Sequence, residues 1–268
     1  MKAEAVQKKA DKRRKRHLLR EYDHRYCRAR DIEILGGLDE AGRGALAGPV
    51  VVGAVVIDMD FRIDGLTDSK KLDVRRRELF YDRILRESRA AAVGWASARE
   101  VDMLNVLGAT LLAGQRALRA LRARPQWLLT DYLHVPECGC EYEALIEGDG
   151  KSQAVAAASV LAKVTRDRWM GLLCEEYPEY CFSDHKGYSV PVHIEALQKY
   201  GASTIHRHTF RGVDWFDREH RRSRTLTRLM EQHATQKILL EEAEDLWQRD
   251  GYFLPEVEWE ILKEAIGQ

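Results

Sequence analysis

The 268-residue chain contains few cysteines, no long apolar run and no excess of either charge. No apolar stretch approaches the ~18 residues of a membrane span, and the N-terminal residues lack the apolar segment of a signal peptide. The five cysteines are scattered and odd in number, so they do not build a disulfide framework. These absences argue against a membrane-spanning protein and a disulfide-rich secreted domain. We expect a cytoplasmic monomer that does not bind membranes.

The balance of charge hides a difference between the two ends of the chain. Residues 1–35 contain 12 basic and six acidic residues, whereas residues 236–268 contain three basic and nine acidic ones. A basic segment favours contacts with phosphate groups, although a solvated basic helix without a partner is the alternative. We expect a basic N-terminal extension (1–31), a central domain (32–213) and an acidic, helical C-terminal extension (214–268).

The apolar pattern of the central domain predicts five strands and four helices. The strands are predicted at residues 32–38, 48–57, 90–98, 127–131 and 143–146, and the helices at 67–88, 101–121, 154–168 and 192–200. The small residues of the third helix would allow it to pack closely on a sheet. The order of the elements favours an α/β fold with a mixed five-stranded sheet flanked by helices over a doubly wound alternation.

A stretch rich in acid and glycine follows the first predicted strand. Asp39 and Glu40 precede Gly42, Arg43 and Gly44. Neighbouring residues of a strand point to opposite faces, so the two carboxylates serve one site only if the strand ends or bends there, and the glycines permit a bend. A dinucleotide-binding fingerprint is excluded, because the glycine spacing is wrong and a β-branched run follows instead of a helix.

Two further acids follow predicted strands. Asp131 ends the fourth strand, and Asp149 comes shortly after the fifth. Acids at the carboxyl ends of parallel strands meet at one edge of a sheet, and carboxylate oxygens suit Mg²⁺ or Mn²⁺. We therefore expect a metal site here; a plain turn between two strands is the alternative for the glycine-rich loop.

Basic residues also occur at informative positions. Lys70 and Lys71 fall in the first turn of the first predicted helix, where cations oppose the helix dipole. This placement indicates a nearby anion, and two exposed lysines without a partner are the alternative. Basic and aromatic residues interleave within 181–211, as they do on nucleic-acid-binding surfaces. Zinc is not expected, because no third ligand is spaced to complete a site with His185 and His193.

Together these motifs resemble one family, the type 2 ribonucleases H, and within it bacterial ribonuclease HII. The resemblance covers about residues 38–213 and rests on ordered blocks: Asp39 to Gly44, Asp68 to Leu72, Asp131, Gly148-Asp149, Ala156 to Asp167 and His185 to Tyr188. It implies a ribonuclease H-like α/β fold. In two places the chain departs from the family: Ser189-Val190 stands where Pro-Thr is usual, and His206 to Thr209 varies an arginine-rich run.

The resemblance implies an endonuclease that hydrolyses the RNA strand of RNA–DNA hybrids. It also implies nicking of duplex DNA on the 5′ side of an embedded ribonucleotide with Mn²⁺ or Mg²⁺, which leaves 3′-hydroxyl and 5′-phosphate ends and serves ribonucleotide and RNA-primer removal. Two cations ~3.5 to 4 Å apart would activate water and stabilise the leaving oxygen. The implied residues are the acids Asp39, Glu40, Asp131 and Asp149, the 2′-hydroxyl-sensing loop of Gly42, Arg43 and Gly44, the sugar-stacking Tyr188, and Ser69 and Lys70 for flanking phosphate.

Two other functions remain as alternatives. The first is a non-catalytic module of the same fold that binds RNA–DNA hybrids, although a binder has no reason to keep four acids beside a polyanion. The second is a DNA-directed nuclease of the same superfamily, although such an enzyme needs no loop that senses a 2′-hydroxyl.

Overall fold

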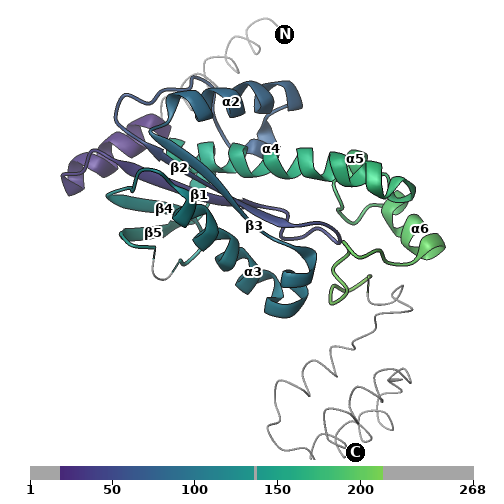
Figure 1. The fold of residues 1–268 in the computed structure, drawn as a ribbon. Helices are drawn as coiled ribbons and strands as arrows, with labels where there is room; N and C mark the ends of the chain where they lie inside the picture. Colours follow the sequence, from purple (N-terminus) through teal and green to yellow (C-terminus); the bar gives the residue numbers. More distant parts are fainter. Residues whose placement is uncertain (1–18, 136–137, 214–268) are drawn as a thin grey trace, which may run out of the picture.

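A five-stranded sheet with helices on both faces forms the centre of the computed structural model, which describes residues 19–135 and 138–213 (Figure 1). The strands are β1 (Leu35–Ala41), β2 (Val50–Ile57), β3 (Ala90–Ala96), β4 (Trp127–Asp131) and β5 (Glu141–Leu145). Their order is β3-β2-β1-β4-β5. β1 pairs antiparallel with β2 and parallel with β4, so the sheet is mixed, as predicted.

Helices lie on both faces of the sheet and beyond one end of it (Figure 1). They are a first helix over residues 19–30, α2 (Val74–Glu87), α3 (Ala98–Ala120), α4 (Gln153–Glu176), α5 (Phe182–His185) and α6 (Pro191–Tyr200), with one-turn 3₁₀ helices η1 (Ser69–Lys71), η2 (Gly148–Gly150) and η3 (Pro178–Tyr180). The first helix, α2 and α4 share one apolar cluster with the sheet, α3 shares a second, and α5 and α6 belong to a third that contains no strand residue (Figure 1). None of the described helices is both long and apolar enough to cross a membrane.

Glycines let the helices lie close to the sheet. A Cβ atom on Gly37 of β1 would be 2.1 Å from the backbone of α4, and one on Gly94 of β3 would be 2.0 Å from the backbone of α3. Real Cβ atoms do not come so near to another backbone, so only glycine permits this packing. The small residues of α4 meet the sheet at the same place, which confirms the prediction of close packing.

The first helix, residues 19–30, packs on this core. Its Asp23 is 1% exposed, and Oδ2 of Asp23 accepts hydrogen bonds from the first two amides of α4 at 2.8 and 3.2 Å. A side chain from a distant helix thereby caps α4. The described part of the predicted N-terminal extension therefore belongs with the central domain. Residues 1–18 and the predicted C-terminal extension (214–268) lie outside the described residues.

The first strand differs from its prediction in a way that matters for the site. β1 ends at Ala41 instead of residue 38, because its pairing with β2 continues to the last pair, Ala41 with Val51. Asp39 and Glu40 consequently lie within the strand and not in the loop after it.

The predicted helix at 67–88 is two separate elements. Leu72 has extended backbone angles (φ −98°, ψ 140°) that end η1, and Asp73 caps the start of α2. Lys70 and Lys71 therefore lie in a single 3₁₀ turn before α2. They do not oppose the dipole of a long helix, so the prediction that placed them in its first turn was wrong.

Candidate active site

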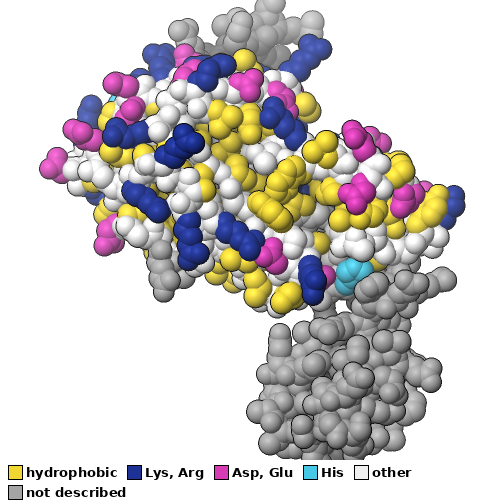
Figure 2. All heavy atoms as spheres, in the orientation of Figure 1, with side chains coloured by type: hydrophobic (Ala, Val, Ile, Leu, Met, Phe, Trp, Pro, Cys, Tyr) yellow, Lys and Arg dark blue, Asp and Glu magenta, His cyan; other side chains and the backbone are white. Residues whose placement is uncertain are grey.

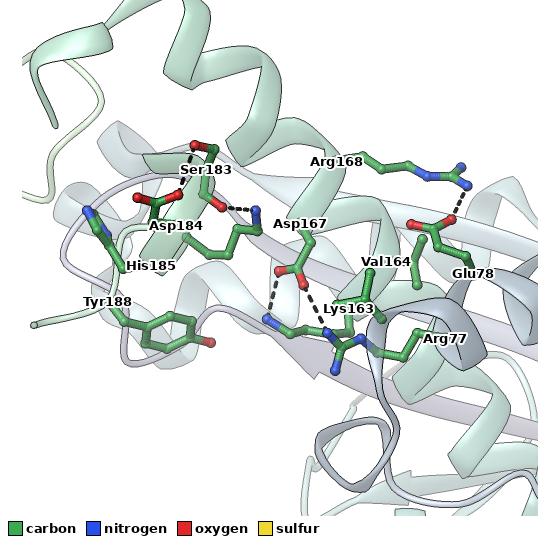
Figure 3. Close-up of a pocket in the computed structure, with 12 residues that line it drawn as sticks. Arg77, Glu78, Lys163, Val164, Asp167, Arg168, Ser183, Asp184, His185 and Tyr188 are labelled. Carbon is green, nitrogen blue, oxygen red and sulfur yellow. Dashed lines mark hydrogen bonds and ion pairs between the residues drawn. The ribbon is translucent and has the colours of Figure 1, made fainter. Parts of the chain in front are cut away.

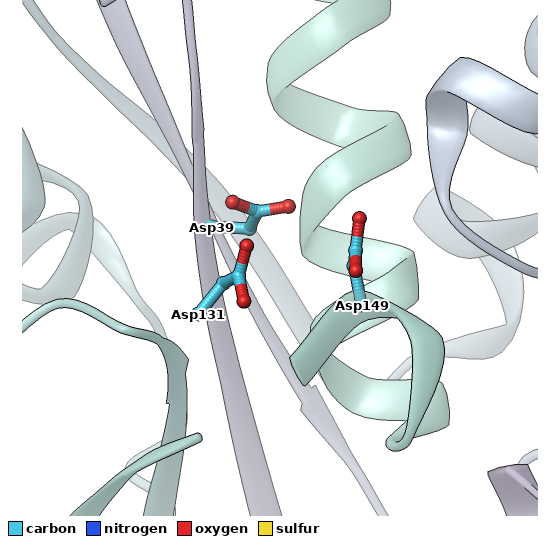
Figure 4. A group of neighbouring side chains, drawn as sticks. All are labelled: Asp39, Asp131 and Asp149. Carbon is cyan, nitrogen blue, oxygen red and sulfur yellow. The ribbon is translucent and has the colours of Figure 1, made fainter. Parts of the chain in front are cut away.

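Three aspartates from three elements converge at one edge of the sheet (Figure 4). Asp39 lies on β1, Asp131 at the end of β4 and Asp149 in η2, and one carboxylate oxygen from each lies within 4.8 Å of the others. β1 and β4 are parallel neighbours, so their carboxyl ends meet at the same edge. Oδ1 of Asp131 also accepts the amide of Gly148 at 2.7 Å, which joins η2 to β4.

Burial and mutual repulsion oppose ionisation of these acids. Burial raises the pKa of Asp39 well above its usual range, and the charges of Glu40 and Asp131 add to this shift. Burial, followed by the charges of Asp68 and Asp131, raises the pKa of Asp149 to about 6. Like charges held this close together repel one another strongly. A divalent cation would relieve the repulsion, and an all-carboxylate donor set fits Mg²⁺ or Mn²⁺.

A further acid, Asp68, lies beside the cluster, and sequence reasoning gave it no role in the site. Its carboxyl group shares a hydrogen bond with that of Asp149. Its Oδ1 accepts the amide of Lys70 at 2.9 Å, and its Oδ2 is 3.0 Å from Nζ of Lys71. Burial opposes ionisation of Asp68, but these hydrogen bonds outweigh it, so its pKa is lowered. Asp68 therefore ionises more readily than Asp149.

Lys70 is a second cation beside this group, after Lys71. Burial opposes its charge, but nearby carboxylates outweigh burial and raise its pKa; in decreasing order of effect they are Asp39, Asp68, Asp149 and Asp131. Lys70 is an exposed residue, so its ammonium group stays charged at the open side of the site.

Glu40 lies outside the three-aspartate cluster. Its carboxylate is not among the three whose oxygens lie within 4.8 Å of one another, although its charge acts on Asp39. Its Oε1 is 3.2 Å from Nη1 of Arg43, and its Oε2 is buried without a hydrogen-bond partner among the described residues. Burial raises the pKa of Glu40 against the opposing charge of Arg43, and the charge of Asp131 also raises it. Three of the four predicted acids thus come together.

The Ser69 side chain is hydrogen-bonded inside the protein. Its side chain is buried, and its Oγ lies 2.8 Å from Oγ of Ser159 on α4. The Ser159 hydroxyl also hydrogen-bonds Asp39. The Ser69 hydroxyl therefore supports Asp39 through Ser159 and is not available to a phosphate. Sequence reasoning missed Ser159, although a hydroxyl inside the otherwise apolar run 154–162 was a signal that could have found it.

The loop after β1 presents bare backbone beside the acids. Gly42 has φ +95°, which favours glycine, and a Cβ there would be 2.0 Å from Nε of Arg166. Nothing lies within 4 Å of the corresponding position of Gly44. The Arg43 side chain is 40% exposed and is held by Glu40. Gly44 is therefore accessible to a ligand without side-chain obstruction, whereas Gly42 is buried beside Arg166.

Tyr188 lines a pocket of about 480 Å³ between α2, α4 and α5 (Figure 3). The centroid of its ring is 5.3 Å from Cζ of Arg166 and 5.7 Å from Nζ of Lys163. Lys163 and Arg77 approach the carboxylate of Asp167 at 2.7 and 4.0 Å, respectively. The pocket thus combines a ring face with several charged groups.

A hydrogen-bonded chain of two buried histidines, His206 and His193, ends at the backbone carbonyl of Tyr188. Nδ1 of His206 accepts a hydrogen bond from the amide of Ser203 at 2.9 Å, so its Nε2 carries the proton. That Nε2 donates to Nε2 of His193 at 3.0 Å. Nδ1 of His193 in turn donates to the carbonyl of Tyr188 at 2.9 Å. Burial lowers the pKa of His193 to about 4 and that of His206 to about 3, so both are neutral. Because His206 and Arg207 are fully buried, the prediction of a basic aromatic surface was wrong for these two residues.

Comparison with known proteins gives one consistent family. A family model described as Ribonuclease HII matches residues 36–213. The chain is 49% identical over 180 residues to ribonuclease HII of Delftia acidovorans, which covers 67% of this chain and 77% of the relative. It is 47% identical over 189 residues to ribonuclease HII of Bacillus licheniformis, which covers 70% and 74%, respectively.

A solved structure supports the same conclusion. The crystal structure of the ribonuclease H2 from Pyrococcus horikoshii OT3 is similar with a TM-score of 0.58 and 29% identity, over 69% of this chain and 97% of that one. The similarity confirms the predicted ribonuclease H-like fold. Given the family match over the whole central domain and the acidic cluster at the sheet edge, this chain belongs to the ribonuclease HII family of metal-dependent endoribonucleases that act on RNA–DNA hybrids.

Proposed function

We propose that this protein, besides hydrolysing the RNA strand of hybrids, nicks duplex DNA on the 5′ side of an embedded ribonucleotide and leaves 3′-hydroxyl and 5′-phosphate ends. One observation carries the proposal: β1 holds Asp39 of the aspartate cluster, and the loop that follows β1 directly exposes the backbone of Gly44. The cluster suits phosphodiester hydrolysis, and the backbone gives access to the 2′-hydroxyl, which distinguishes RNA from DNA at a given nucleotide. Removal of ribonucleotides from DNA and of RNA primers follows from this activity.

The acids would hold the divalent ions. Mn²⁺ or Mg²⁺, when bound, supplies Lewis-acid activation of water and stabilisation of the leaving 3′-oxygen. The ligands would be Asp39, Asp131 and Asp149, with Glu40 as a fourth, because its Oε2 has no hydrogen-bond partner among the described residues. The amide of Gly148 and the hydroxyl of Ser159 orient the carboxylates of Asp131 and Asp39 before a substrate arrives.

Other residues would hold the nucleic acid. Lys70 is charged and exposed beside the acids, which suits a phosphate flanking the scissile bond. The ring of Tyr188 lines an open pocket, which suits stacking on the adjoining sugar. Residues 42–44 would contact the ribose itself. The face of the molecule in Figure 2 carries Lys and Arg side chains, which can contact phosphates, interspersed with Asp and Glu side chains.

Cleavage of matched duplexes tests the proposal. One DNA duplex carries a single ribonucleotide, a second is all DNA, and a third is an RNA–DNA hybrid, each incubated with Mn²⁺ or Mg²⁺. We expect a single nick 5′ to the ribonucleotide and cleavage of the hybrid. Asp39→Asn should lower the rate more than ~100-fold, beyond the 10- to 100-fold loss typical of groups that only orient metal ligands. Asp82→Asn, at an exposed position of α2, is the matched control.

The alternatives predict other results. Equal cutting of the all-DNA duplex would favour a DNA-directed nuclease. Tight binding of the hybrid without any cutting, with either metal, would favour a binding module.

A further inference from the structure

Two arginines lie inside the protein close to the proposed ribose-sensing loop. Arg166 of α4 and Arg207, which follows α6, are both 0% exposed, and neither forms an ion pair with a described carboxylate. All of their hydrogen bonds within the described part of the chain go to backbone carbonyls. Arg166 donates to Ala47, Pro49 and Lys186, and Arg207 donates to Gly42, Arg43 and Gly48. Burial of a guanidinium group is costly unless its donors are satisfied, and here the loop carbonyls accept from them.

Arg207 hydrogen-bonds the first two residues of the loop after β1, Gly42 and Arg43. Its Nη2 donates to the carbonyl of Gly42 at 2.7 Å, and its Nη1 donates to the carbonyl of Arg43 at 2.8 Å. Its Nε and Nη2 donate to the carbonyl of Gly48 at 3.1 and 2.9 Å, which ties the beginning of the loop to its end. One planar group therefore sets the direction of two successive peptide units.

The direction of these carbonyls determines that of two amides. In a trans peptide the C=O and N–H groups point in opposite directions. The carbonyl of Gly42 shares its peptide with the amide of Arg43, and the carbonyl of Arg43 shares its peptide with the amide of Gly44. Because Arg207 draws both carbonyls inward, both amides point away from it. Neither amide donates to another described residue, and the space beside Gly44 is open.

Arg166 links the same loop to Tyr188. It donates to the carbonyls of Ala47 and Lys186 at 3.1 and 2.9 Å, and its Cζ is 5.3 Å from the centroid of the Tyr188 ring. The amides of Leu46 and Ala47 also donate to the carbonyl of Gly187. Arg166 thus connects the end of the loop to the segment that contains Tyr188. It does not bind the carbonyls of Gly42 and Arg43, which accept from Arg207.

We propose that Arg207 is a positioning residue for ribose recognition: it directs the amides of Arg43 and Gly44 toward the 2′-hydroxyl of a bound ribonucleotide. This inference rests on the proposed function. The guanidinium group keeps its charge at neutral pH, since burial and the charge of Arg166 lower the pKa of Arg207 only to about 9.

The test compares two matched variants, Arg207→Lys and Arg166→Lys. Lysine keeps the charge, but its compact ammonium group does not reproduce the flat fork of donors that spans three carbonyls. For Arg207→Lys we expect kcat on a single-ribonucleotide duplex to fall about 10- to 100-fold, as expected when one or two hydrogen bonds are misdirected. The inhibition constant of the matched all-DNA duplex, which lacks the hydroxyl, should stay within about twofold of wild type, because phosphate contacts dominate its binding. Arg166→Lys should lose stability to a similar extent and lose less kcat.

The outcomes distinguish a positioning role of Arg207 from a structural one, and both from a failure of the proposed function. A loss of kcat that is equal in the two variants and follows their loss in melting temperature would make Arg207 a purely structural residue and overturn the proposal. If wild type cleaves the ribonucleotide duplex and Arg207→Lys cleaves it equally well, the positioning role falls and the proposed function stands. If wild type does not cleave it, the proposed function fails first.

A second measurement covers the case in which Arg207→Lys does not fold. In Asp39→Asn protein, the amide signals of Arg43 and Gly44 in ¹H–¹⁵N spectra should shift with the ribonucleotide duplex and much less with the all-DNA duplex. Equal shifts with both duplexes would overturn the proposal.

Discussion

Replacing Asp39 by asparagine should stabilise the metal-free protein while it removes activity. Asp39 is 5% exposed, and one of its oxygens lies within 4.8 Å of oxygens of Asp131 and Asp149. Two unit charges 4.8 Å apart repel by about 3 kcal/mol at an effective dielectric constant of ~20. Asparagine keeps an oxygen that accepts the amide of Glu40, which Oδ1 of Asp39 now accepts at 2.7 Å. We expect the free energy of unfolding at pH 8 in EDTA to rise by ~1–3 kcal/mol.

The size of this effect should depend on pH. Burial and neighbouring charges raise the pKa of Asp39 in the folded state, so the folded protein binds this proton more tightly than the unfolded chain does. Wild type therefore loses stability as the pH rises through the folded pKa. Below the unfolded pKa of ~3.9 the carboxyl group is protonated in both states and the effect disappears. The advantage of Asp39→Asn should accordingly grow from acidic pH toward pH 8.

Urea unfolding with EDTA and with saturating Mn²⁺ measures the prediction. A ligand that binds only the folded state stabilises it by RT ln(1 + [L]/Kd), so Mn²⁺ should stabilise wild type strongly and Asp39→Asn weakly, which reverses their order. Asp82→Asn should behave like wild type throughout. The reasoning is refuted if Asp39→Asn is the less stable protein in EDTA at pH 8, or if both proteins gain equally from Mn²⁺.

Three further changes test the packing around the site. Lowering the pH from 6.5 to about 4 should cost a few kcal/mol of stability, because the pKa values of His193 and His206 lie below those of unfolded histidine. In urea unfolding, the stability of His193→Gln should therefore depend less steeply on pH than that of wild type. An unchanged slope would contradict this. Gly37→Ala should destabilise the folded protein by about 3 kcal/mol in thermal unfolding, because its Cβ would be 2.1 Å from the α4 backbone. Gly171→Ala is the matched control within α4: its Cβ would meet open space, so it should stabilise the protein by ~0.5–1 kcal/mol. Asp23→Ala should cost ~1–3 kcal/mol, since two amides at the start of α4 lose their acceptor, and Asp23→Asn should cost less; equal losses in denaturant titrations would argue against a capping role.

Sequence patterns determined the main elements of the fold and the acids at the sheet edge. β4 was predicted with its observed bounds, 127–131, because its apolar run is short and ends in a carboxylate. The convergence of Asp39, Asp131 and Asp149 was also predictable, because the carboxyl ends of parallel strands share an edge. These features depend on local periodicity and on general rules of topology, which a single sequence contains.

Only the tertiary structure decided the finer arrangement of the site. Glu40 lies within a strand and not in a loop because β1 stays paired with β2 beyond it, and a sequence does not state where pairing stops. Ser69 turns inward because Ser159, 90 residues away, offers its hydroxyl. Arg207 belongs to a basic stretch that resembles an exposed surface, yet it is buried because the carbonyls of a loop more than 150 residues earlier need its donors. Such contacts join segments far apart in the chain, so they exist only once the sheet and its helices have assembled.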